Sequence, residues 1–243
     1  MKTKSKTKKI DIRFKLLNRE ASLVTSLLSN GLADFRSISK GNGYYYQAFY
    51  SVSIGLERLL KLLILSKSKR RSVKTFNHDI KKLFLEVGIS FDKDSIEQSI
   101  INFLHEFASK NRYLIPDILS SNDLSQIGKE PIMFFHNEVL NKIIKIHQPR
   151  RVFVPPSDFP ADVFYIAEDF SEVTNLQDMI VRGQLTEYAS KYLVMYTGRI
   201  LQPILNELYK IEGSEYGNPY FSEGFVYLHQ DDSYFKTRKT YKL

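Results

Sequence analysis

Apolar residues recur at steps of three and four along the first half of the chain, which is the spacing of one face of an α-helix. We expect helices over residues 11–30 and 45–65, a short helix from Ile80 to Val87, and a fourth helix closing near Tyr113. The stripe of the second helix comprises Phe49, Val52, Leu56, Leu59, Leu60 and Leu63. Because each helix must cover its stripe, the pattern predicts an all-α fold built as an antiparallel helical bundle.

The pattern changes after the fourth helix. A further helix is expected over 132–146, followed by H-Q-P-R-R-V-F-V-P-P-S-D-F-P, whose four prolines predict an extended linker over 148–169. Additional C-terminal helices are expected within 170–243, the longest over 178–209, with Pro203 bending or dividing it. The stretch F-V-Y-L-H-Q-D-D-S-Y-F-K-T predicts a short β-hairpin around a polar turn.

The amino-acid composition excludes several kinds of site and segment. The chain of 243 residues is 43% hydrophobic and 26% charged, as expected for a globular protein with a substantial core. It has no cysteine, which excludes thiolate chemistry and fits a reducing, cytoplasmic compartment. Its five histidines form no HExxH-like pair, and no apolar run approaches the length of a membrane span. We therefore expect no metal, no other cofactor and no membrane association.

Positive charge is concentrated in two runs. Residues 1–10 hold five of the lysines behind the net charge of +8, so the rest of the chain is only mildly basic. We interpret these residues as a disordered tail that serves solubility or loose contact with phosphates. The second run, K-S-K-R-R-S-V-K, joins the second and third helices and comprises Lys67, Lys69, Arg70, Arg71 and Lys74. It is either a solvated loop or a phosphate-binding one.

His78 directly follows this basic run. Asn77 is a candidate N-cap of the third helix, and Asp79 suits its first turn. At this position the helix dipole would keep the imidazole of His78 neutral and able to act as a base. In the alternative interpretation His78 only covers the end of the bundle. Glu57 and Lys61 stand four residues apart, as a surface ion pair would.

Three blocks carry a resemblance to a known family. G-L-E-R-L-L-K-L-L, F-N-H-D-I-K-K-L-F and a helix closing on N-R-Y-L-I-P lie in order between about residues 45 and 116. They resemble the HEPN superfamily (higher eukaryotes and prokaryotes nucleotide-binding domain). The resemblance implies an HEPN-like bundle over 11–147 that forms a homodimer. Many members are metal-independent RNases of prokaryotic toxin–antitoxin, CRISPR-associated or abortive-infection systems, and others keep the fold without catalysis.

The family's signature is an Arg followed after four to six residues by a His, near the last helix of the bundle. Arg71 and His78 have this spacing but precede the third helix, whereas Arg112 and Tyr113 match an R-Y pair that no His follows. The resemblance thus implies three catalytic residues, three supporting residues and four nucleic-acid-binding residues: Arg71, His78 and Arg112; Glu57, Asp79 and Tyr113; Lys67, Lys69, Arg70 and Lys74. In such chemistry the 2′-OH is the nucleophile, so a base, an acid and a cation on the phosphate are needed.

Two further groups stay open. His105, with Glu106, is seven residues before Arg112 and could form a second cluster on that helix face. A stripe of tyrosines with one arginine could stack bases: Tyr188, Tyr192, Tyr196 and Arg199. The same helical spacing also fits a place in the core or in a subunit interface. The leading hypothesis is an RNase of a defence or toxin–antitoxin module, with RNA or a nucleotide as ligand and an antitoxin or other defence protein as partner. The alternative is a non-catalytic helical module that binds nucleotides or proteins.

Overall fold

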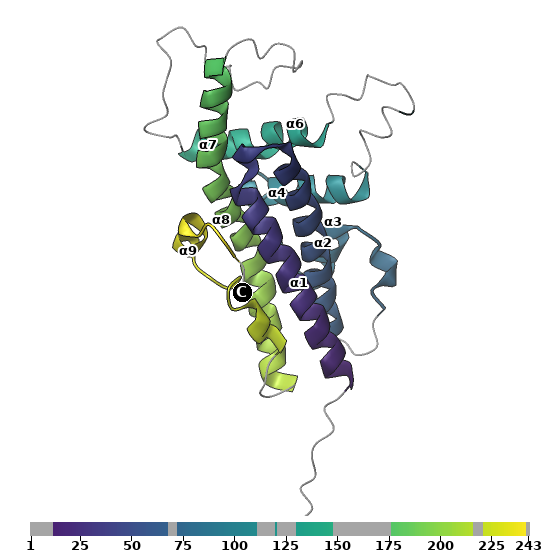
Figure 1. Cartoon of the computed structure of the whole chain (residues 1–243). Coiled ribbons are helices and arrows are strands. Elements are labelled where there is room, and N and C mark those ends of the chain that lie inside the picture. The colour runs from purple at the N-terminus through teal and green to yellow at the C-terminus, as the bar shows by residue number, and fades with distance from the viewer. Residues whose placement is uncertain are drawn as a thin grey trace, which may run out of the picture.

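The computed structural model describes residues 12–67, 72–110, 120, 130–147, 176–215 and 221–241. Its described elements are helical, and no strand occurs among these residues, so the all-α prediction is confirmed. Long helices lie side by side along one axis, and shorter helices cross one end of the bundle and flank its side (Figure 1). None of the described helices is long and apolar enough to cross a membrane.

The first two helices form the centre of the bundle. α1 (Ile12–Arg36) and α2 (Asn42–Lys67) run antiparallel and are joined by the short turn η1 (Ile38–Lys40) (Figure 1). They approach closely because each has a glycine at the contact. A Cβ added at Gly31 would lie 2.5 Å from Val52 Cγ2, and one added at Gly55 would lie 2.8 Å from Leu28 Cδ2. All six apolar residues expected in the stripe of α2 are buried.

Two shorter helices cover one side of α2. α3 (Ile80–Val87) begins at Asp79, whose Oδ1 accepts from Lys82 N at 2.9 Å, and it ends at Gly88, whose φ is 76°. The N-cap is therefore Asp79 and not Asn77 as the sequence indicated, because the chain turns at Asn77 and becomes helical only after Asp79. α4 (Ile96–Ser109) begins at Ser95, whose hydroxyl accepts from Gln98 N.

The helix expected over 132–146 is confirmed, although its middle is an underwound π-helical turn. α6 (Pro131–Phe135), a π-helical turn η5 (His136–Leu140) and α7 (Asn141–His147) follow one another without a break. They lie across the end of the bundle where α1 stops and α2 starts (Figure 1). Phe135 is fully buried there and stacks on Phe35 at 5.8 Å between ring centroids, which ties this helix to the bundle core.

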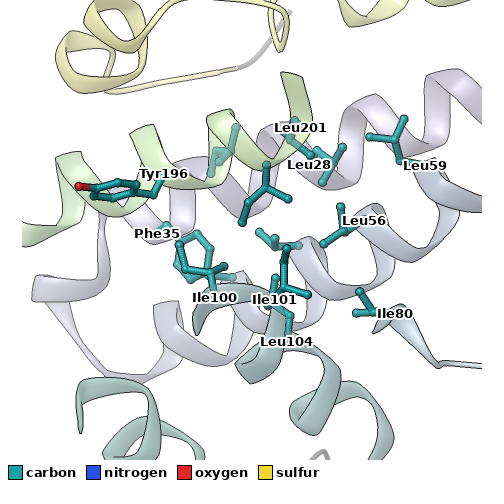
Figure 2. Close-up of a cluster of buried hydrophobic side chains, with 14 of the residues drawn as sticks. Leu28, Phe35, Leu56, Leu59, Ile80, Ile100, Ile101, Leu104, Tyr196 and Leu201 are labelled. Atoms are coloured by element: carbon teal, nitrogen blue, oxygen red, sulfur yellow. The ribbon is translucent and has the colours of Figure 1, made fainter. Parts of the chain in front are cut away.

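α8 (Leu176–Glu215) is one long helix that passes through Pro203 without dividing. Residues on both sides of the proline, including Ile200, Leu201, Ile204 and Leu205, are fully buried, so tertiary packing holds the helix together. Figure 2 shows Leu201 and Tyr196 of α8 among side chains of α1, α2 and α4. The hydrophobic core therefore includes α8 as well as the first helices. The linker expected over 148–169 and the tail over 1–10 lie outside the described residues.

The expected C-terminal β-hairpin is wrong. The segment forms η8 (Phe221–Phe225) and α9 (Asp232–Thr237), because Asp231 caps a helix by accepting from Tyr234 N at 2.8 Å. Phe235 of α9 is buried against Gly198 of α8, where an added Cβ would lie 2.4 Å from the Phe235 ring. The alternation of aromatic and polar residues thus reflects docking onto α8 and not strand pairing.

Candidate functional site

Glu57 is the centre of a polar cluster between α2 and the chain that leads into α3. Its side chain is buried within α2, and both of its oxygens have partners. Lys61 Nζ donates to Oε1 at 2.5 Å, and His78 Nδ1 lies 2.9 Å from Oε2. The expected Glu57–Lys61 pair is confirmed, but it is not a surface pair, because Glu57 is only 6% exposed.

The contact with Glu57 orients His78. An ionised carboxylate only accepts hydrogen bonds, so the Nδ1 of His78 donates and Nε2 keeps a free lone pair in the neutral ring. The side chain of His78 is 59% exposed, whereas that of Glu57 is 8% exposed. A buried carboxylate therefore holds the ring while its other nitrogen is available to a ligand, as in a carboxylate–histidine pair of an acid–base catalyst.

The turn before α3 is held in an unusual backbone conformation. Asn77 has φ 44° and ψ −124°, a region that residues other than glycine rarely adopt and that costs on the order of 1–3 kcal/mol. Lys61 Nζ donates to the Asn77 carbonyl at 2.8 Å, and Phe76 in the preceding turn η2 (Lys74–Phe76) is buried. Lys61 thereby fixes the loop and the carboxylate together, a role that the sequence interpretation did not assign to it.

His105 of α4 approaches Asp79, the residue that follows His78 in the chain. Its Nδ1 lies 3.5 Å from Asp79 Oδ1, close enough for electrostatic attraction but not aligned as a hydrogen bond, so this buried nitrogen has no hydrogen-bond partner among the described residues. Burial lowers the pKa of His105, and the Asp79 carboxylate partly offsets that effect. Arg112, with which the sequence grouped His105, lies outside the described residues, so that second cluster stays a prediction. Glu106 instead pairs with Lys110 along α4.

The remaining residues of the expected site have different placements. Lys74 is exposed in η2, near His78 in the chain. Lys67 lies at the end of α2, where its Nζ is 3.6 Å from Glu207 Oε2 and 3.5 Å from the Val87 carbonyl. Lys69, Arg70, Arg71, Arg112 and Tyr113 lie outside the described residues. Their assignments stay predictions.

The tyrosine stripe of α8 surrounds another histidine. His147, the last residue of α7, stacks on Tyr192 at 3.7 Å between centroids and shares a 2.9 Å hydrogen bond with the Tyr196 hydroxyl. Lys191 Nζ lies 4.1 Å from the centre of the Tyr188 ring. Burial lowers the pKa of His147, and three nearby cations lower it further: Lys236, Arg199 and Lys191. Of the alternatives for this stripe, packing accounts for the contacts present.

Neither a metal-binding arrangement nor a similar known protein indicates a function for the Glu57 cluster. Within the described ranges, no group of three or more His, Asp or Glu side chains is arranged to hold a metal ion. No family model, no curated protein and no solved structure matches this chain.

Proposed function

We propose that this protein is an HEPN-like, metal-independent endoribonuclease in which His78 is the general base. One observation carries the proposal: the exposed imidazole of His78 is held through Nδ1 by the buried carboxylate of Glu57 at 2.9 Å. Orientation by a buried acid presents Nε2 in one tautomer, as general-base catalysis requires.

The reaction would begin when His78 Nε2 removes the proton of a ribose 2′-OH. The 2′ oxygen then forms a bond to the adjacent phosphorus while the bond from phosphorus to the 5′ oxygen breaks. The leaving oxygen takes up a proton from the imidazolium that has formed or from water. The products are a 2′,3′-cyclic phosphate and a 5′-OH, and no redox step or co-reactant is needed.

Negative charge that develops on the phosphate needs a cation. The sequence assigns this task to Arg71 and Arg112, which can bind phosphate oxygens with two hydrogen bonds each. Lys74, exposed beside the turn that carries His78, is the described cation of the basic run that suits an approaching phosphate. Lys61 has a different task, since it donates to Glu57 and to the Asn77 carbonyl.

A ribonuclease assay in EDTA tests the proposal. The wild-type protein should cleave single-stranded RNA, and His78→Ala should not, while the melting temperature stays within a few degrees because the side chain is 59% exposed. Arg112→Ala should also lose activity. Activity that needs an added divalent metal would contradict the mechanism.

A non-catalytic binding module is the second candidate, and one observation favours it. Lys61 joins Glu57 to the Asn77 carbonyl, so the cluster also fixes the loop that leads into α3. In that case the wild-type protein would bind its ligand but release no RNA fragments.

The association state belongs to the same proposal. By resemblance we propose a cytoplasmic homodimer of a prokaryotic defence or toxin–antitoxin module, with an antitoxin or another defence protein as its partner. Light scattering should give about twice the mass of one chain. A monomer at micromolar concentration would contradict the homodimer.

A further inference from the structure

A groove runs between α1, η1 and the first turns of α2, and none of its lining residues belongs to the Glu57 cluster. Its volume is about 840 Å³. The last described residues, which follow α9, form one wall of it. The lining side chains that matter here are Asn30, Gln47, Tyr46, Tyr50, Lys40 and Lys239.

The charge of the groove favours an anionic ligand. Lys40 and Lys239 are both exposed, and neither forms an ion pair with a described residue. The wall that contains Lys239 belongs to the stretch K-T-R-K-T-Y-K-L, residues 236–243, which has four basic residues and no acidic one. Asp34 is the single carboxylate of the lining. Two cations facing one polar groove can bind neighbouring phosphates.

The aromatic side chains give the groove a second property. Tyr46 and Tyr50 are half-buried and are held from behind by Phe107 of α4, at 6.4 and 5.1 Å between ring centroids. The Tyr46 hydroxyl also donates to Glu130 Oε1 at 2.7 Å. Rings that are fixed on one side and border a groove on the other can stack with bases, and amide side chains such as Gln47 can bond base edges.

The groove and the Glu57 cluster share one face of α2. Along α2 the step from Tyr46 to Tyr50 is four residues, the step from Tyr50 to Glu57 is seven, and the step from Glu57 to Lys61 is four. In a helix with 3.6 residues per turn, these steps place the four side chains on nearly the same side. From Tyr50 to Glu57 the helix rises about 10 Å. A stacked strand rises about 3.4 Å per nucleotide, so about three nucleotides cover that distance.

We infer that this groove binds single-stranded RNA next to the cleaved bond, with phosphates on Lys40 and Lys239 and a base against Tyr46 or Tyr50. This inference rests on the proposed ribonuclease activity, since it names where that substrate is held. The residues of the groove are positioning residues and take no part in proton transfer.

Binding can be measured apart from cleavage with a 2′-O-methyl oligoribonucleotide, which lacks the nucleophile. Fluorescence anisotropy of a labelled strand should show binding by the wild type and by His78→Ala alike. The variant Lys40→Ala/Lys239→Ala should bind on the order of tenfold more weakly, and its slope of log Kd against log salt should fall by about 0.7 for each lysine removed. The matched control Lys93→Ala/Lys145→Ala, with two exposed lysines outside the groove, should bind as the wild type does.

A second pair of variants tests stacking. Tyr50→Leu should weaken binding without changing the salt dependence, whereas Tyr50→Phe, which keeps the ring, should bind normally. Equal losses in both lysine pairs, displacement of RNA by poly-glutamate at equal charge, or no binding by the wild type would overturn the inference. Binding through the groove without any cleavage of ordinary RNA would support the groove and overturn the ribonuclease proposal. Cleavage of ordinary RNA with a normal KM by the groove variants would support the ribonuclease proposal and overturn the groove.

Discussion

His78 and His147 both bind another side chain through one ring nitrogen, but their surroundings give them opposite properties. His78 pairs with a buried carboxylate and exposes most of its ring. His147 is stacked on Tyr192, bonded to the Tyr196 hydroxyl and surrounded by cations. Burial and nearby cations oppose protonation of His147, whereas the Glu57 carboxylate orients the exposed ring of His78. The comparison favours His78 for the proposed proton transfer and packing for His147.

The largest expected effect separates the two histidines by activity. His78→Ala should reduce RNA cleavage by about 10²- to 10⁴-fold, the usual contribution of a general base. His147→Ala should cleave at the wild-type rate per folded molecule. Initial rates in EDTA, corrected for the folded fraction by circular dichroism, measure both. Equal cleavage rates for His78→Ala and His147→Ala would contradict the different roles proposed for the two histidines.

The next effect tests whether Glu57 acts through His78. Glu57→Gln keeps the shape of the side chain but removes the negative charge beside His78 Nδ1, and it lets the amide select the wrong tautomer. We expect kcat to fall by about 10²-fold or more with KM little changed. Glu20→Gln is a matched control, since Glu20 pairs with Arg58 between α1 and α2, outside the Glu57 cluster. A change confined to KM would show that Glu57 contributes to binding instead.

In stability, His147→Ala should have a larger effect than His78→Ala. His147→Ala removes a stacked ring and leaves the Tyr196 hydroxyl without its partner, so the free energy of unfolding should fall by about 1–3 kcal/mol. His78→Ala should lower it by less, because its ring is mostly in solvent and water can take its place on the Glu57 carboxylate. Urea denaturation measures both values. A larger loss for His78→Ala would favour the structural interpretation of the Glu57 cluster.

The smallest effect is a pH dependence of stability. His147 and His105 both have a pKa lowered by burial, so the unfolded chain binds more protons than the folded one. Their contribution is therefore complete above the unfolded pKa of about 6.5 and is lost as the pH falls through the lower folded pKa. His147→Gln should flatten the decline in melting temperature below that pH. An unchanged pH profile in this variant would contradict the burial of His147.

The long helices could be predicted because local pattern and burial agree. The apolar stripe of α2 is buried throughout, and Gly88 ends α3 in the left-handed conformation that favours glycine. The prediction failed where tertiary packing overrides local pattern. The end of the chain has a strand-like alternation, yet α9 forms because Phe235 docks onto Gly198. Of the two effects expected of Pro203, bending or dividing α8, division does not occur, because buried neighbours hold both halves.

The candidate site was predictable only in part. Glu57, His78 and Asp79 were selected from sequence, and the pairing of Glu57 with Lys61 follows from their spacing. The contact between His78 and Glu57 joins residues 21 positions apart through a turn at Asn77 with positive φ, which no periodicity announces. The approach of His105 to Asp79 likewise depends on how α4 packs beside α3.

End-group analysis of the RNA products tests the central claim most directly. Single-stranded RNA incubated with the wild-type protein in EDTA should yield 2′,3′-cyclic phosphate and 5′-OH ends, which ³¹P NMR and end-labelling distinguish from simple phosphomonoesters. The same incubation with His78→Ala should leave the RNA intact. Intact RNA with the wild-type protein, 5′-phosphate ends, or the same cyclic product from His78→Ala would contradict general-base catalysis by His78.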